Sequence, residues 1–233
     1  MSKKRFIRAI WGIYDNSHKI IQRRQKVDLD IQRIIKSPYT EPFRTYVLGQ
    51  DNYNRLIKMG VTDCVLVDKR PYLFDLIKHQ YRHKMELIRY AMEEDGIDEL
   101  VYMDWDCVPR KKLPKGFWQT LRGKDVFQAT LQMYHRKKCM WRKESVRKVP
   151  NGGFIYLRDK SLPTYAISLW ENLEKPDNDE PAWAKMTDNM MGGFHMDEYW
   201  NRFEPMVCNL HRSSPYSQEL LKTKNECFIH YQG

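Results

Sequence analysis

The first half of the chain alternates between short apolar runs and longer segments in which apolar residues recur at helical spacing. The apolar runs, which predict β-strands, lie at 6–14, 44–48, 63–68 and 100–103. Helices are predicted where apolar residues recur every three or four positions, over 20–35, 53–59 and 73–92. Strands that alternate with helices in this way predict βαβ units and a mainly parallel central sheet.

The second half of the chain is less regular. The elements predicted there are helices at 114–121, 163–173 and 197–201 and strands at 126–133, 151–157, 206–210 and 227–230. The basic stretch at 135–148 is a candidate for a mobile lid. The polar stretch at 177–181 is predicted to be a solvated loop because Pro176 and Pro181 lie at its two ends. No internal repeat or linker interrupts the pattern, so we predict a single α/β domain over 1–233.

The sequence contains three Asp-x-Asp motifs, and only one of them follows a predicted buried strand. The motif at 28–30 lies in a helical pattern, where residues two apart do not share a face. The motif at 177–179 lies in the predicted loop. Asp104 and Asp106 follow the apolar run at 100–103, and the alternation of side chains along a strand predicts that both carboxylates point to the same side. Such a pair predicts an oxygen-rich site for a divalent cation, and turn residues at a strand end are the alternative.

Composition adds a basic charge to this picture. The formal net charge is +10 and the pI is about 9.3, which indicates anionic partners such as nucleic acid, a membrane surface or a phosphate-bearing substrate. Hydrophobic residues make up 42% and aromatic residues 13% of the chain, as in a folded globular protein.

Targeting signals and disulfide patterns are missing from the sequence. No apolar stretch reaches the roughly 20 residues that a transmembrane helix needs, and the basic N-terminus lacks the long apolar run of a secretory signal. The five cysteines are scattered and form no Cys-x-x-Cys pair. Reduced thiols in a cytoplasmic protein without a transmembrane segment are therefore expected.

Four motifs, taken in their order along the chain, resemble those of nucleotide-sugar glycosyltransferases of the A-type fold. The motifs are Trp11-Gly12-Ile13-Tyr14, Asp104-Trp105-Asp106, Asn151-Gly152-Gly153-Phe154 and His230-Tyr231-Gln232-Gly233. The last is similar to the late His-x-x-Gly of glycogenin-like members. The resemblance implies a Rossmann-like glycosyltransferase-A fold, with a nucleotide-binding half at 1–110 and an acceptor and donor-sugar half at 111–233.

The resemblance implies metal-dependent transfer of a sugar from a nucleoside-diphosphate sugar, with uridine as the expected base, to a glycan or other hydroxyl acceptor. It assigns Asp106 and His230 as direct metal ligands, and Asp104 as a ligand of the metal or of the donor. Carboxylate ligands suit Mn2+ or Mg2+, and the imidazole favours Mn2+. The cation would act as a Lewis acid that stabilises the diphosphate leaving group.

The resemblance also implies a set of donor-binding residues. These are Trp11, Gly12, Tyr14, Lys84, Asp104, Trp105, Asn151, Gly152, Gly153 and Gly233. Trp11 and Tyr14 are candidates to stack on the base, since aromatic faces accept any base. Core packing is the alternative for both residues. Lys84 is a candidate to meet phosphate or base, and a surface charge is its alternative.

The catalytic acid–base group is expected in the second half of the chain. Glycogenin-like enzymes carry an Asp-Gln pair before the last strands, and the pair chosen here as its match is Asp197-Glu198. In an inverting enzyme Asp197, or Glu198 in its place, would act as general base on the acceptor hydroxyl. In a retaining enzyme Asp197 would instead orient the donor or stabilise positive charge on the sugar. The alternative for both residues is an acidic pair at the N-terminus of a helix, where it offsets the helix dipole.

A basic nucleic-acid-binding or metal-dependent nucleic-acid-cleaving protein is the main alternative. The positive charge and the interleaved aromatic residues fit that function, and acidic pairs bind metal in nucleases. However, the sequence contains no recognition-helix, RNA-binding or zinc-finger motif. Strong salt dependence of oligonucleotide binding would favour this alternative, whereas manganese-dependent binding of UDP would favour the transferase.

Overall fold

The fold is taken from a computed structural model of the 233-residue chain. The structure describes residues 3–11, 18–67, 80–121, 126–137, 140–173, 179, 182–183, 185–186, 207–211 and 228–232. For residues 18–24, 80, 120, 126–137, 140–151, 207–211 and 229–232, only the backbone is described.

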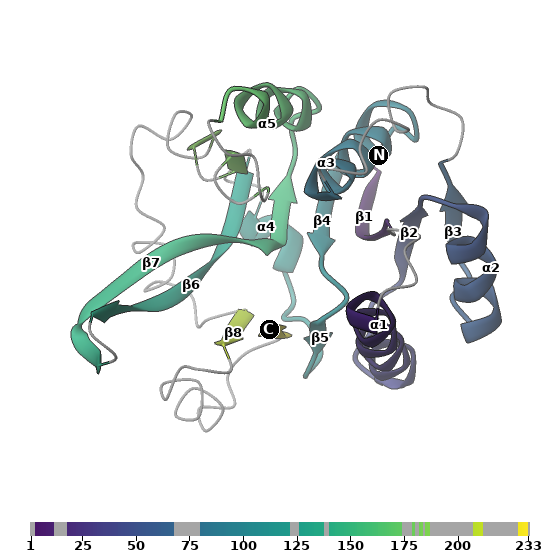
Figure 1. Ribbon diagram of the computed structural model, residues 1–233. Coiled ribbons are helices and arrows are strands. Elements are labelled where there is room, and N and C mark those ends of the chain that lie inside the picture. The colour runs from purple at the N-terminus through teal and green to yellow at the C-terminus, as the bar shows by residue number, and fades with distance from the viewer. Residues whose placement is uncertain are drawn as a thin grey trace.

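A six-stranded sheet with the strand order β3-β2-β1-β4-β7-β6 forms the centre of the molecule (Figure 1). Its strands are β1 (Lys4–Ile10), β2 (Phe43–Val47), β3 (Cys64–Leu66), β4 (Glu99–Met103), β6 (Val126–Lys137) and β7 (Met140–Leu157). The strands β3, β2, β1 and β4 are parallel, and β7 and β6 add antiparallel strands at one edge. The predicted α/β class with a mainly parallel sheet is confirmed.

Helices cover both faces of this sheet. They are α1 (His18–Lys36), α2 (Gln50–Met59), α3 (Gln80–Glu93), α4 (Phe117–Leu121) and α5 (Leu162–Glu171). Figure 1 shows α3 and α5 on one face and α1 on the other. Among the described helices, none is both long and apolar enough to cross a membrane.

Successive side chains of β1 and β4 point to opposite faces of the sheet, so each strand contributes to a hydrophobic core on both faces. Ile7 and Tyr102 face α3 and α5 and join the core formed with those helices. Phe6, Val101 and Met103 face the other way, into a core that includes Phe228 from the end of the chain. The sheet is therefore buried on both faces, as expected for parallel strands covered by helices.

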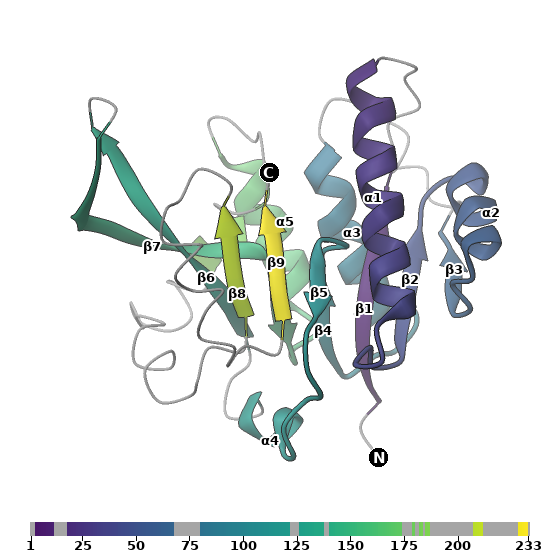
Figure 2. The ribbon, with the colours of Figure 1, turned by 90° about the horizontal axis from the view of Figure 1, so that it is seen from below.

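A second, three-stranded sheet lies beside α1 in the view of Figure 2. It consists of β5 (Cys107–Pro109), β9 (Phe228–Gln232) and β8 (Val207–His211) in that order. β9 is antiparallel to β5 and parallel to β8. The sequence pattern predicted β8 and β9 but not β5, a three-residue strand that ends at a proline. This small sheet brings the end of the chain to the residues that follow Asp106.

The described residues of the basic stretch, 135–137 and 140–148, lie in β-strands. β6 and β7 pair as a long antiparallel hairpin with register shifts near Gln128 and Tyr134. Its distal part extends away from the body of the molecule (Figures 1 and 2). The expected strand at 126–133 is thus part of a longer one, and most of the stretch interpreted as a lid lies in β-strands. The pattern missed this because basic residues interrupt the apolar alternation there.

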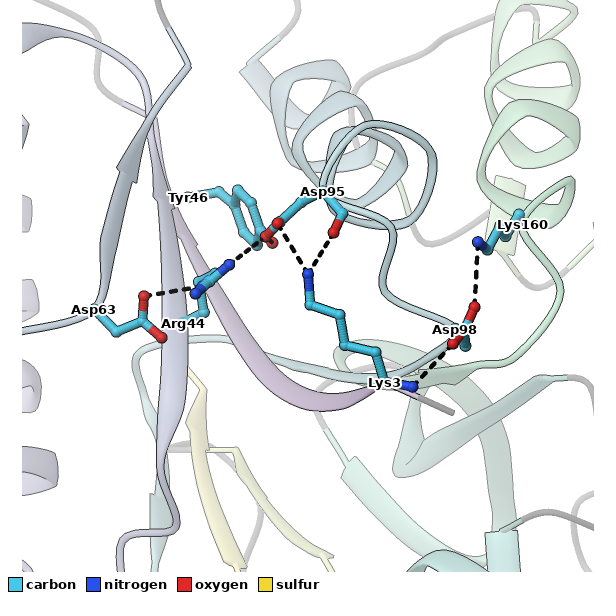
Figure 3. A network of polar contacts seen from close by, with 7 residues as sticks. All are labelled: Lys3, Arg44, Tyr46, Asp63, Asp95, Asp98 and Lys160. Carbon is cyan, nitrogen blue, oxygen red and sulfur yellow. Dashed lines mark hydrogen bonds and ion pairs between the residues drawn. The ribbon is translucent and has the colours of Figure 1, made fainter. Parts of the chain in front are cut away.

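A polar network fixes the amino ends of the strands, opposite to the Asp104 end (Figure 3). The Asp95 carboxylate, just before β4, accepts from Lys3 Nζ at 3.1 Å, from Arg44 Nη1 at 2.6 Å and from the Tyr46 hydroxyl at 2.5 Å. Burial favours a higher pKa for Asp95, but these hydrogen bonds outweigh it and lower the pKa. The network joins β1, β2 and the α3–β4 connection, so we expect it to contribute to stability.

Asp95→Asn is expected to lower the free energy of unfolding at neutral pH by about 2 kcal/mol, because it weakens hydrogen bonds to charged groups. A carboxyl with a lowered native pKa contributes stability above its unfolded pKa and loses it as the pH falls through the native pKa. Urea titrations at neutral and acidic pH should therefore show the two proteins converging in acid. The control is Asp98→Asn, whose carboxyl is more exposed and which should lose less. Equal losses for both variants, or a difference that grows in acid, would contradict this account.

Candidate active site

The segment Asp104-Trp105-Asp106 forms a turn at the carboxyl end of β4. Cys107 N donates to Asp104 O at 3.0 Å, which closes the turn, and Asp104 N donates to Gly153 O on β7 at 2.9 Å. The strand ends at Met103, so the alternation used to place the two carboxylates does not extend to them. Their side chains are 29% and 24% exposed. Two partly exposed carboxylates thus sit at the edge of a parallel sheet where ligands bind in α/β proteins.

The indole of Trp105 points into the protein. Trp105 is 6% exposed, packs in the core against α1 and α2, and donates from Nε1 to Ala9 O at 2.9 Å. Its sequence-based assignment to the donor pocket stays a prediction, and its observed contacts are those of a side chain that anchors the turn.

Lys84 on α3 links Asp104 to a second carboxylate. Its Nζ lies 3.5 Å from Asp104 Oδ1 and 3.0 Å from Asp179 Oδ2, and 4.9 Å from the centroid of the Tyr102 ring. The Tyr102 hydroxyl donates to the same oxygen of Asp104. Lys84 is 2% exposed. The alternative interpretation of Lys84 as a surface charge is therefore wrong. A buried ammonium shared by two carboxylates beside the acidic turn makes this cluster a candidate functional site.

Asp179 is a candidate site residue that the sequence did not reveal. The loop predicted at 177–181 was expected to be solvated, yet Asp179 is 2% exposed and accepts from Trp183 Nε1 at 2.8 Å. Burial raises the pKa of Asp179; Lys84 opposes this rise and Asp104 adds to it. The prediction for Asp179 is therefore wrong, because a lysine distant in sequence compensates its charge. Trp183, at helical spacing after Asp179, is the signal that could have suggested burial.

Helix α1 places charges beside Asp106. Lys26 Nζ lies 3.8 Å from Asp106 Oδ2. Asp30, one turn further along the helix, is 2% exposed and accepts from Arg33 Nη1 at 2.8 Å. Burial raises the pKa of Asp30, and the charge of Asp106 adds to this effect. Each carboxylate of the turn therefore has a lysine next to it, Lys84 at Asp104 and Lys26 at Asp106.

The backbone of His230 lies next to the turn. In the antiparallel pair of β5 with β9, His230 is directly opposite Cys107, the residue after Asp106. Residues opposed in this way have Cα atoms about 4.5–5.5 Å apart. The His230 side chain lies outside the described part, and its role as a ligand stays a prediction. Among the side chains that the structure describes, no three His, Cys, Asp or Glu residues are grouped so as to hold a metal ion.

The remaining predicted donor residues are only partly described. Trp11 is partly buried and packs against the core beneath α3 and α5. Gly152 and Gly153 are buried in β7, and Gly153 holds the amide of Asp104. Asn151 is described only in its backbone, within β7. The other predicted residues, Gly12, Tyr14, Asp197, Glu198 and Gly233, lie outside the described residues.

Comparisons with known proteins identify the fold. No protein-family model matches the sequence, and no curated protein matches it significantly. The apo structure of mouse xyloside xylosyltransferase 1 aligns with a TM-score of 0.50 and 9% identity, over 100% of this chain and 98% of that chain. The apo structure of the bifunctional glycosyltransferase WbbM aligns with a TM-score of 0.52 and 12% identity, over 100% of this chain and 46% of that chain. The chain therefore has the α/β fold of the A-type glycosyltransferases.

Proposed function

We propose that the protein is a glycosyltransferase that takes its sugar from a nucleoside-diphosphate sugar. The observation that carries the proposal is the acidic turn Asp104–Asp106 at the carboxyl end of β4, in a fold shared with two glycosyltransferase structures. Lys84 and Asp179 lie beside this turn and supply further polar groups. This set of groups suits a sugar diphosphate, which presents both hydroxyls and negatively charged oxygens.

The residues at the turn fit a divalent cation by their chemistry. Asp104 and Asp106 supply carboxylate oxygens, and His230 lies on the strand paired with the residue after Asp106. Oxygen ligands with one imidazole suit Mn2+, with Mg2+ as a second choice. When bound, the cation would offset the negative charge that develops on the diphosphate as the glycosidic C–O bond breaks.

The chain's own side chains would orient the donor. The ammonium of Lys84 restrains the Asp104 carboxylate and neutralises part of its charge, while the Tyr102 hydroxyl donates to the same oxygen. Asp179 accepts hydrogen bonds and would bind sugar hydroxyls next to the turn. Such fixed polar groups accelerate a reaction by holding the reacting bond in one orientation. They also provide a preorganised charge distribution that stabilises the transition state.

A second acidic pair in the sequence is a candidate for orienting the donor. Asp179-Glu180 is acidic like Asp197-Glu198, and Asp179 contacts the group that pairs with Asp104. We therefore propose Asp179 as the donor-orienting residue and keep Asp197 as the proposed general base toward the acceptor. NMR of the product anomer would distinguish inversion from retention, and full activity of Asp197→Asn would remove Asp197 from the mechanism.

The proposal is tested with a panel of nucleotide sugars incubated with the protein and Mn2+, with released nucleoside diphosphate as the readout. Hydrolysis or transfer of at least one donor, lost on addition of EDTA, is expected. The alternative function is tested in parallel by oligonucleotide binding at several salt concentrations. Salt-sensitive oligonucleotide binding together with no turnover of any donor would favour a nucleic-acid-binding protein.

A further inference from the structure

Arg8 is a buried cation in the middle of the central sheet. Phe6, Arg8 and Ile10 share one face of β1, and the two apolar neighbours belong to the cores on that face. Arg8 is 1% exposed. Burial lowers its pKa, while acidic groups around it, Asp104 and Asp106 among them, act in the opposite direction. A buried charge is costly unless hydrogen bonds or an opposite charge compensate it.

The guanidinium of Arg8 holds both ends of the acidic turn. Nη1 donates to Asp104 O at 2.5 Å, and Nη2 donates to Cys107 O at 2.9 Å. The same group stacks near two rings, 5.4 Å from the centroid of Phe43 and 5.3 Å from that of Trp105. In addition, Trp105 Nε1 donates a hydrogen bond to the backbone oxygen of Ala9, the residue after Arg8. The turn is therefore attached to β1 through two side chains, Arg8 from the strand and Trp105 from the turn.

Stability alone does not account for this arginine. Its Nε is buried and has no hydrogen-bond partner among the described groups. A buried donor without a partner is unfavourable, and apolar residues often replace buried charges without loss of stability. Both hydrogen bonds that the Arg8 guanidinium donates go to carbonyl oxygens of the turn. The structural element that the buried charge stabilises is therefore the turn.

We infer that Arg8 is a positioning residue that fixes the turn from Asp104 to Cys107 and so sets the spacing of the two carboxylates for a divalent cation. This inference rests on the proposed function. Two properties of arginine are required. Its planar fork reaches two carbonyl oxygens at once, and its delocalised charge lies over the Phe43 and Trp105 rings. Lysine offers the charge without the fork.

Arg8→Lys is the first test. Removing a group that supports metal ligands typically reduces metal affinity 10–100-fold, so we expect about that loss in the affinity for Mn2+ with UDP, measured by isothermal titration calorimetry. The electron paramagnetic resonance spectrum of bound Mn2+ should change as well, which a general loss of stability would not cause. The matched control is Arg44→Lys, since Arg44 makes two ion pairs at the opposite end of the strands. The control should lower the melting temperature without changing Mn2+–UDP affinity.

The outcomes separate this inference from the proposed function. If the wild-type protein binds no Mn2+–UDP, the proposed function fails. If the wild type binds and Arg8→Lys binds equally well with an unchanged spectrum, the inference is overturned. Should Arg8→Lys not fold, Phe43→Leu takes its place, because it leaves both hydrogen bonds and removes one stacking ring. A several-fold loss of affinity in that variant supports the inference, and wild-type affinity overturns it.

Discussion

Asp106→Asn is expected to reduce the affinity for Mn2+–UDP by more than about 100-fold, since even groups behind the metal ligands typically change affinity 10–100-fold. The Asp106 side chain is 24% exposed at the turn after β4. The substitution therefore removes the negative charge of the proposed metal ligand without opening a cavity. Calorimetric titration of Mn2+ in the presence of UDP measures the loss directly. Donor turnover should fall in parallel.

The control for this variant is Asp63→Asn. Asp63 is also a partly exposed aspartate, but it pairs with Arg44 at the amino ends of the strands. Its replacement should leave Mn2+–UDP affinity unchanged. Asp106→Asn with wild-type affinity would exclude Asp106 as a ligand and would leave the acidic turn without the role proposed for it.

Lys84→Met is expected to have the largest effect on stability. The substitution leaves the buried Asp179 carboxylate and the neighbouring Asp104 without their shared ammonium. Removing one partner of a buried ion pair typically costs about 3–5 kcal/mol. Urea denaturation at neutral pH measures this cost. Lys160→Met is the control, because Lys160 pairs with Asp98 at the surface and its loss should matter little.

The pH dependence of Lys84→Met gives a second check. Without Lys84, the pKa of Asp179 rises further above its unfolded value. The folded variant then binds a proton more tightly than the unfolded chain does, so its stability falls as the pH rises through that interval. The variant should therefore be least stable, relative to wild type, at neutral pH and should recover toward acid. A pH-independent deficit would contradict the buried ion pair.

The double variant Lys84→Met/Asp179→Asn separates stability from function. With both buried charges removed, stability should recover much of the loss seen in Lys84→Met. UDP and donor binding should remain impaired, because the groups proposed to face the donor are still missing. Recovery of both properties together would show that Lys84 and Asp179 serve only the fold.

The parallel core of the fold could be predicted from the sequence because its signals are local. Apolar runs such as 44–48 and 100–103 correspond to β2 and β4, and helical spacing up to Ile35 corresponds to α1. The order of strands and helices was then enough to predict a mainly parallel sheet. Short β5 has no such signal, since its pairing with β9 is decided by residues at the far end of the chain.

The site was less predictable because its geometry depends on contacts between distant residues. The sequence indicated Asp104 and Asp106, but the turn that holds them depends on Arg8 and Gly153. Asp179 lies in a polar, proline-containing stretch, and its buried carboxylate is compensated by Lys84, which reaches it from α3. Local polarity predicts exposure when no partner is known, and a partner so far away in sequence cannot be inferred from spacing.

The most direct test of the account is a crystal structure of the protein with Mn2+ and UDP, in which anomalous scattering locates the metal. We predict a single strong peak at coordination distance from carboxylate oxygens of the Asp104–Asp106 turn, with His230 on the same ion and the diphosphate of UDP against it. A metal peak elsewhere, or UDP bound away from the carboxyl end of β4, would contradict it.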